Sequence, residues 1–243
     1  MPTGPKSPFV FAHGSWHGAW CWRKLTPLLE AAGHRCYTLS YTGMGDRAHL
    51  LGPGITVNTF VDDIAGVIEA EELEGATLVA HSFGGIPATG AAAKARARLS
   101  RLVYLDAALV QSGQSAFDTY PPADVHARTV AAQKGGGGLA VPAPHVLSPM
   151  WGITPDMEDY AWFMRRLTAH PIGAFSTPLY YEGAPGAGLE VTYIECTAPV
   201  NPLIPGARAL AKAQPGWKYV RFAAPHEAMI THPRELADLL LAP

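Results

Sequence analysis

Thr77-Leu-Val-Ala80 runs directly into His81-Ser82-Phe83-Gly84-Gly85, and a stretch rich in small residues follows. The apolar stretch predicts a buried strand and the small residues a closely packed helix, with Ser82 on the sharp turn between them. Ala80 and Gly84, two residues before and two after Ser82, are small enough for strand and helix to approach each other. Such a turn lifts the Ser82 hydroxyl above the sheet edge, a position typical of a nucleophile.

Strands and helices alternate on both sides of this turn. Buried strands are predicted at 9–12, 35–40, 76–80, 102–105, 191–196 and 218–222. Helices are predicted at 22–32, 56–70 with Thr56 or Asn58 as cap, 84–97, 206–213, and from Pro233 onward. Because this alternation requires crossover connections, the sequence predicts an α/β fold, a mostly parallel sheet flanked by helices.

The alternation stops at about residues 108–188, which hold aromatic clusters, many prolines and the glycine run 135–138. We interpret this stretch as a mainly helical cap inserted into a single domain that spans 1–243, with its core at 1–107 and 189–243. The glycine run is expected to be a flexible tip, because no Lys-Ser/Thr follows it as in a phosphate loop.

The composition excludes several classes of protein. A hydrophobic fraction of 48% with 16% charged residues is typical of a globular protein, and no apolar run approaches the ~20 residues of a membrane span. The net charge of -2 and scattered Lys and Arg residues disfavour nucleic acid as a partner. Residues 1–8 contain no signal segment, so a cytoplasmic location is expected. The three cysteines are expected to be buried thiols, and histidine spacing typical of a metal site is missing.

His226 follows the last predicted strand, at the carboxyl edge of the sheet where Ser82 is also expected. This order, with the serine early and the histidine last, predicts His226 as the general base. His232 next to Pro233 is instead interpreted as a residue at a helix start.

The turn after the first strand, His13-Gly14-Ser15-Trp16, is predicted to face the same edge. The backbone N–H groups of Phe83 and Ser15 are the expected donors to a developing oxyanion. Five residues are expected to contact the substrate: Gly14, Trp16, His81, Trp151 and Trp162.

Four segments together resemble the plant methyl esterase and hydroxynitrile lyase branch of the α/β-hydrolases and its bacterial relatives. They are the segment His13 to Trp22, the segment His81 to Gly85, the pair His170-Pro171, and the segment His226 to Met229 with His232-Pro233. The resemblance implies an α/β-hydrolase fold with a helical cap, a Ser-His-Asp triad, an oxyanion hole from the N–H groups of Ser15 and Phe83, and no cofactor.

The lyases of this branch carry Thr and Lys where this chain has Gly14 and Glu227. Gly14 offers no hydroxyl for a cyanohydrin, and Glu227 would repel leaving cyanide. Esterase activity on a small, partly apolar ester is therefore the expectation. A carbon–carbon lyase and a catalytically impaired binding protein are the alternatives, and a homodimer is possible.

The sequence departs from the family at the triad acid, since the stretch 197–205 after the strand at 191–196 contains no carboxylate. A histidine base needs an acceptor at Nδ1, so we predict that Asp106, at the end of the strand after the nucleophile helix, replaces the usual acid. Asn201 is the main rival as a neutral acceptor. Glu195, within a strand, and Glu227, on the loop of the base itself, rank lower.

Overall fold

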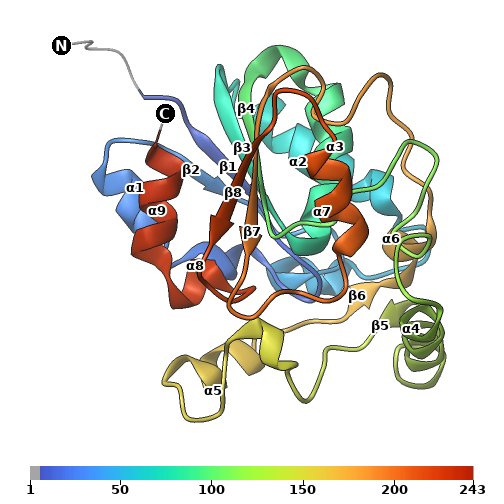
Figure 1. The fold of residues 1–243 in the computed structure, drawn as a ribbon. Helices are drawn as coiled ribbons and strands as arrows, with labels where there is room; N and C mark the ends of the chain where they lie inside the picture. The colour runs from blue at the N-terminus through green and yellow to red at the C-terminus, as the bar shows by residue number, and fades with distance from the viewer. Residues whose placement is uncertain (1–5, 243) are drawn as a thin grey trace.

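The computed structural model describes residues 6–242 and contains a six-stranded sheet in the order β2-β1-β3-β4-β7-β8 (Figure 1). Every pairing within this sheet is parallel. Its strands are β1 (Phe9–Ala12), β2 (Cys36–Thr38), β3 (Ala76–His81), β4 (Leu99–Leu105), β7 (Glu190–Cys196) and β8 (Lys218–Phe222). The predicted parallel sheet is confirmed.

Helices cover both faces of the sheet. They are α1 (Thr26–Ala31), α2 (Val57–Ala70), α3 (Gly85–Lys94), α7 (Pro205–Lys212), α8 (Ala228–Thr231) and α9 (Pro233–Leu241), with 3₁₀ turns η1 (Ala19–Trp22), η2 (Gly45–Leu50), η3 (Ser82–Gly84) and η4 (Arg96–Arg98). In Figure 1, α1 and α9 lie on one side of the sheet and α2, α3 and α7 on the other.

Alternate residues of each strand build two core layers, because successive side chains of a strand point to opposite faces. Phe9 and Phe11 of β1 pack in the layer that contains α1 and α9. Val10 and Ala12 pack in the layer that contains α2, α3 and α7. Both layers exclude water, so the strand ends that carry the polar side chains of the site are held rigidly.

Two of the predicted helices are divided in the structure. The predicted helix 22–32 is split into η1 and α1, and α1 begins at Thr26 with Pro27 in its first turn, where a missing N–H costs nothing. Thr56 rather than Asn58 caps α2, through reciprocal hydrogen bonds with Thr59. The predicted helix 84–97 divides into η3, α3 and η4, and β4 begins earlier than predicted, at Leu99.

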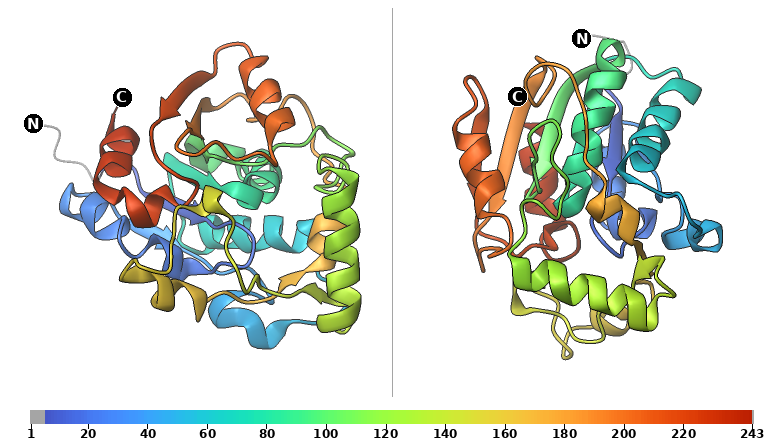
Figure 2. Two further views of the ribbon diagram at one scale, coloured as in Figure 1. Left: turned by 60° about the horizontal axis from the view of Figure 1, so that its bottom comes forward. Right: turned by 90° about the vertical axis from the view of Figure 1, so that its right-hand side faces the viewer.

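The chain between β4 and β7 lies across the carboxyl ends of the strands (Figure 2). It contains α4 (Pro122–Gly135), β5 (Ala140–Val141), the 3₁₀ turn η5 (Pro149–Trp151), α5 (Asp159–Met164), β6 (His170–Pro171) and α6 (Ile172–Ser176). The antiparallel pair of β5 and β6 was not predicted, because two-residue strands carry no periodicity. We refer to residues 108–188 as the cap.

Within residues 6–242, no helix has both the length and the apolar character needed to cross a membrane. Part of the segment predicted to lack a signal, residues 1–5, lies outside the described residues.

Candidate active site

Ser82 occupies the turn between β3 and α3 in a left-handed backbone conformation, with φ of 54°. A non-glycine residue is rarely held there, and such strain is typical of functional positions. Gly84 explains how the turn fits: a Cβ at this position would lie 2.5 Å from the carbonyl oxygen of His13. Helix α3 therefore approaches β1 closely enough to fix Ser82 at the sheet edge.

Ser82, His226 and Asp106 form one chain of hydrogen bonds. The Ser82 hydroxyl lies 2.9 Å from Nε2 of His226. Nδ1 of His226 lies 2.6 Å from Oδ2 of Asp106, across 120 residues of sequence. Because the carboxylate only accepts, it fixes the tautomer in which Nδ1 carries hydrogen and Nε2 is free to accept the Ser82 proton.

The Asp106 carboxylate is completely buried and is held from two sides. It follows β4 with φ of 42°, and its backbone N–H donates to the carbonyl of Ile194 on β7. Its second oxygen, Oδ1, accepts a hydrogen bond from the backbone N–H of Cys196. The end of β7 thus orients the carboxylate at the end of β4, although the loop 197–205 that follows β7 carries no carboxylate.

The other groups considered as acceptors for His226 are turned elsewhere. The amide nitrogen of Asn201 lies 3.5 Å from Nδ1 of His226, while its amide oxygen accepts a hydrogen bond from the N–H of Leu203. The amide therefore presents a donor to the ring rather than an acceptor. Glu195 faces away from His226 and pairs with Arg208 at 3.4 Å and Arg221 at 3.5 Å.

The electrostatic surroundings favour the protonated form of His226. Burial by itself would lower the pKa of this imidazole. The hydrogen bond and the charge of Asp106, with the charge of Glu227, outweigh burial and raise the pKa of His226 above its ordinary value. A proton taken from Ser82 would therefore be held firmly.

A cavity of about 30 Å³ opens beside Ser82. Of the residues predicted for the site, it is lined by Ser15, Trp16, Ser82, Trp151, Asn201, His226 and Glu227. Met150 of the cap also lines it, and the sequence analysis missed the remaining lining residues, His17, Ala108, Tyr120, Arg128, Leu203 and Ile204.

The turn that carries Ser15 is braced by buried His13. Nδ1 of His13 donates to the carbonyl of Gly14, and Nε2 accepts the backbone N–H of Tyr41. Burial lowers the pKa of His13 to about 3, so the ring stays neutral and keeps both bonds. On the other side, the N–H of Phe83 lies in the first helical turn, where no acceptor is available within the helix.

Three residues predicted to contact the substrate do not line the cavity. Gly14 is wedged against Ser82, since a Cβ there would lie 2.9 Å from Cβ of Ser82. His81 is fully buried and donates from Nε2 to the carbonyl of His226, so it positions the loop of the base. Trp162, on α5, instead packs edge-on against Trp20 of η1.

Glu227 and His17 form a buried pair at the cavity wall, with Nε2 of His17 3.2 Å from Oε2 of Glu227. Nδ1 of His17 lies 2.6 Å from the carbonyl of Ser15, so both ring nitrogens face acceptors. Burial raises the pKa of Glu227, but the charges of His17 and His81 dominate and lower it to about 2. The pair links the loop of the base to the turn of Ser15. The only sequence feature that pointed to this pair of His17 and Glu227 was the repetition of histidine in the segment His13 to Trp22.

Glu227→Gln is expected to lower the free energy of unfolding at neutral pH by about 2 kcal/mol, because His17 loses a buried charged partner. Urea unfolding measures this difference. The pKa of Glu227 falls from 4.5 to about 2 on folding, so the carboxylate stabilises the fold above 4.5. That contribution is lost as the pH falls toward 2. The difference in free energy of unfolding between wild type and Glu227→Gln should therefore become smaller at low pH.

Glu190→Gln is the matched control, because Glu190 is exposed and lies 4.0 Å from Arg101. It should change stability by less than about 0.5 kcal/mol. Equal stabilities of wild type and Glu227→Gln at neutral pH would contradict the role given to the pair.

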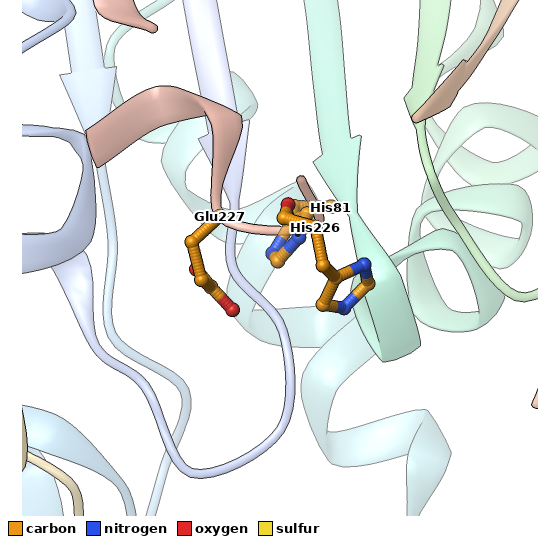
Figure 3. A group of neighbouring side chains, drawn as sticks. All are labelled: His81, His226 and Glu227. Atoms are coloured by element: carbon orange, nitrogen blue, oxygen red, sulfur yellow. Dashed lines mark hydrogen bonds between the residues drawn. The ribbon is translucent and has the colours of Figure 1, made fainter. Parts of the chain in front are cut away.

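His81, His226 and Glu227 carry potential metal ligand atoms within 4.8 Å of one another (Figure 3). Both ring nitrogens of His226 are already engaged, with Asp106 and with Ser82. Nε2 of His81 bonds to the carbonyl of His226. A metal ion would have to replace these hydrogen bonds, so the cluster fits a hydrogen-bonded site better than a metal site.

Residues 9–239 match the model of the family described as the alpha/beta hydrolase family. The chain belongs to this family. The match confirms the predicted fold class, and the order of strands and helices around Ser82 is that of an α/β-hydrolase.

Relatives within the alpha/beta hydrolase family include esterases. The chain is 36% identical to a carbendazim hydrolyzing esterase of Nocardioides sp. (strain SG-4G), covering 96% of this chain and 98% of the relative. It is 28% identical to Methylesterase 9 of Arabidopsis thaliana, covering 96% of both. The solved structure of the methylesterase MES16 from Arabidopsis superposes with a TM-score of 0.74 at 25% identity, covering 97% of both chains. The predicted resemblance to the methyl esterase branch is confirmed.

Proposed function

We propose that this α/β-hydrolase is a serine esterase that cleaves a small, partly apolar carboxylic ester through an acyl-enzyme on Ser82. The observation that carries the proposal is the continuous hydrogen-bonded chain from Ser82 through His226 to Asp106 at the wall of a cavity. Likeness over the full chain to an esterase and to a methylesterase supports the same reaction class.

In the first half of the reaction, Nε2 of His226 takes the Ser82 proton while Oγ attacks the ester carbonyl carbon. The buried Asp106 stabilises the imidazolium that forms, and the carbonyl oxygen becomes an oxyanion held by the N–H groups of Ser15 and Phe83. Collapse of the tetrahedral intermediate breaks the bond to the alcohol, which receives the proton from His226. An acyl-Ser82 ester remains.

In the second half, His226 removes a proton from a water molecule, whose oxygen attacks the acyl carbon of the Ser82 ester. The acid product leaves and Ser82 regains its proton. Trp16 and Trp151 line the cavity and provide apolar contacts for the substrate. Methyl esters belong among the first substrates to test, because a methylesterase is among the relatives that match over the full chain.

Lyase chemistry is less well supported. A Thr at position 14 would bring its Cβ within 2.9 Å of Cβ of Ser82 and 3.0 Å of Nδ1 of His81, so this backbone has no room for it. Glu227, where the lyases carry Lys, is a buried carboxylate with a lowered pKa. The other alternative, a catalytically impaired binding protein, would show no ester turnover in the test below.

The test is a rapid-mixing assay of 4-nitrophenyl acetate and butanoate, followed by mass spectrometry of the quenched protein. Expected results are a burst of about one nitrophenol per protein and an acyl adduct on the peptide that contains Ser82. Steady turnover of either ester without an adduct on this peptide would overturn the acyl-enzyme on Ser82. A folded protein without turnover of these and methyl esters would overturn the esterase.

We also propose that the protein works in the cytoplasm and acts on a small molecule. The three cysteines, Cys21, Cys36 and Cys196, are free thiols in the structure, which fits a reducing compartment. Whether two chains associate is answered by light scattering of the purified protein.

A further inference from the structure

Arg128 brings a positive charge from the cap to the wall of the catalytic cavity. It lies on α4 and lines the same cavity as Ser82. Its guanidinium carbon lies 4.8 Å from the ring centre of Trp16, 4.9 Å from Phe175 and 5.1 Å from Tyr120. Contact with three aromatic rings stabilises the cation and limits its rotation. The group is therefore held in one place beside the nucleophile.

The guanidinium of Arg128 makes no hydrogen bond with any of residues 6–242. None of the ion pairs formed within residues 6–242 includes Arg128. Nη1 of Arg128 is buried and has no hydrogen-bond partner in the described part of the chain. A buried donor without an acceptor is costly, and aromatic faces do not replace the acceptor that a planar N–H fork requires.

Each of the two carboxylates close to this cavity faces a histidine ring. Glu227 lies 3.2 Å from His17, and Asp106 lies 2.6 Å from His226. Arg128 is the cation of the cavity wall that lacks such a partner among the described residues. A ligand that supplies a carboxylate would satisfy both its charge and its donors.

We propose that Arg128 binds a free carboxylate on the substrate, so that the preferred substrates are esters that carry a second, ionised carboxyl group. This inference rests on the proposed esterase function. The guanidinium fork matches the two oxygens of a carboxylate, and the same cavity wall carries Ser82, which attacks the ester carbonyl. Binding the carboxylate at Arg128 fixes the distance between the anionic end of the substrate and the nucleophile.

Two matched pairs of esters test the inference on either side of the scissile bond. For the acyl side, the pair is mono-4-nitrophenyl glutarate and 4-nitrophenyl pentanoate. For the alcohol side, it is 4-acetoxybenzoate and 4-acetoxybenzamide. The measured quantity is the ratio of kcat/KM for the anionic ester to kcat/KM for the neutral one. A substitution that disturbs Ser82 or His226 changes kcat/KM of both esters of a pair by the same factor. Such a disturbance therefore leaves the ratio unchanged.

We expect Arg128→Gln to lower this ratio at least tenfold in one of the two pairs, equivalent to about 1.4 kcal/mol. Arg128→Lys keeps the charge without the planar fork and should lie between wild type and Arg128→Gln. It also serves as the variant if Arg128→Gln fails to fold. Arg166→Gln is the matched control, because Arg166 stacks on Trp162 at 5.0 Å and does not line the cavity. It should leave the ratio unchanged.

An unchanged ratio in both pairs for Arg128→Gln, or for Arg128→Lys where only that variant folds, overturns the inference. So does an equal fall of the ratio in Arg166→Gln. The proposed function survives either result as long as wild type turns over the neutral esters. A folded wild type that hydrolyses neither the esters of these pairs nor methyl esters overturns both the inference and the proposed function.

Discussion

Replacing Ser82 with alanine is expected to lower kcat for 4-nitrophenyl esters by about a millionfold, the scale seen when a serine nucleophile is removed. The reason is chemical: within residues 6–242, the Ser82 hydroxyl, at 2.9 Å, is the only one that hydrogen-bonds to Nε2 of His226. The residual rate reflects binding and the oxyanion donors alone. Steady-state and burst kinetics with purified protein measure the loss.

Ser100→Ala is the matched control for this substitution. Ser100 is exposed on β4 and donates to the carbonyl of Gly75, so its loss should affect neither burst nor turnover. A Ser82→Ala protein that keeps more than about a hundredth of wild-type kcat would remove Ser82 as nucleophile, provided that trace wild-type enzyme is excluded.

Asp106→Asn is expected to lower kcat about ten thousandfold with little change in KM, as in triads that lose the carboxylate but keep the geometry. An asparagine amide can present its N–H₂ group to Nδ1 of His226, which favours the wrong tautomer. The imidazolium also loses the negative charge that lies 2.6 Å away. Steady-state kinetics with an aryl ester measures kcat and KM separately.

Asn201→Ala is expected to have a much smaller effect on kcat than Asp106→Asn. Its amide oxygen is committed to the N–H of Leu203, so we expect a less than tenfold effect on kcat. The opposite pattern, a large loss in Asn201→Ala and a small one in Asp106→Asn, would exclude Asp106 as the triad acid.

The pH dependence gives a second readout of the same substitution. A protonated His226 cannot accept the Ser82 proton, so kcat/KM rises as the pH increases through the pKa of this imidazole. Asp106 and Glu227 raise that pKa above its ordinary value, so the rising limb of wild type lies at higher pH than an unperturbed histidine would give. Asp106→Asn removes one cause of the increase, and the limb should move to lower pH.

The sequence by itself determined the parallel sheet and most of its flanking helices. It also determined that Ser82 and His226 follow strands and lie at the same edge of that sheet. These features depend on short-range rules: apolar runs of strand length, a glycine beside the turn, and a histidine directly after the last strand. Strand β1 and strand β8 were predicted at their observed bounds for this reason. The cap was less predictable, because its strands of two residues form only through pairing with each other.

The tertiary structure decided which acceptor faces His226 and which side chains form the cavity wall. The sequence left Asp106 and Asn201 as alternatives, because residues 120 and 25 positions from His226 cannot be ranked by spacing. Folding places β4 beside β7, so the carboxylate of Asp106 reaches Nδ1 while the amide oxygen of Asn201 is used by its own loop. Arg128 and the pair of His17 with Glu227 follow the same principle. Local pattern carries no information about contacts that form only when distant elements pack together.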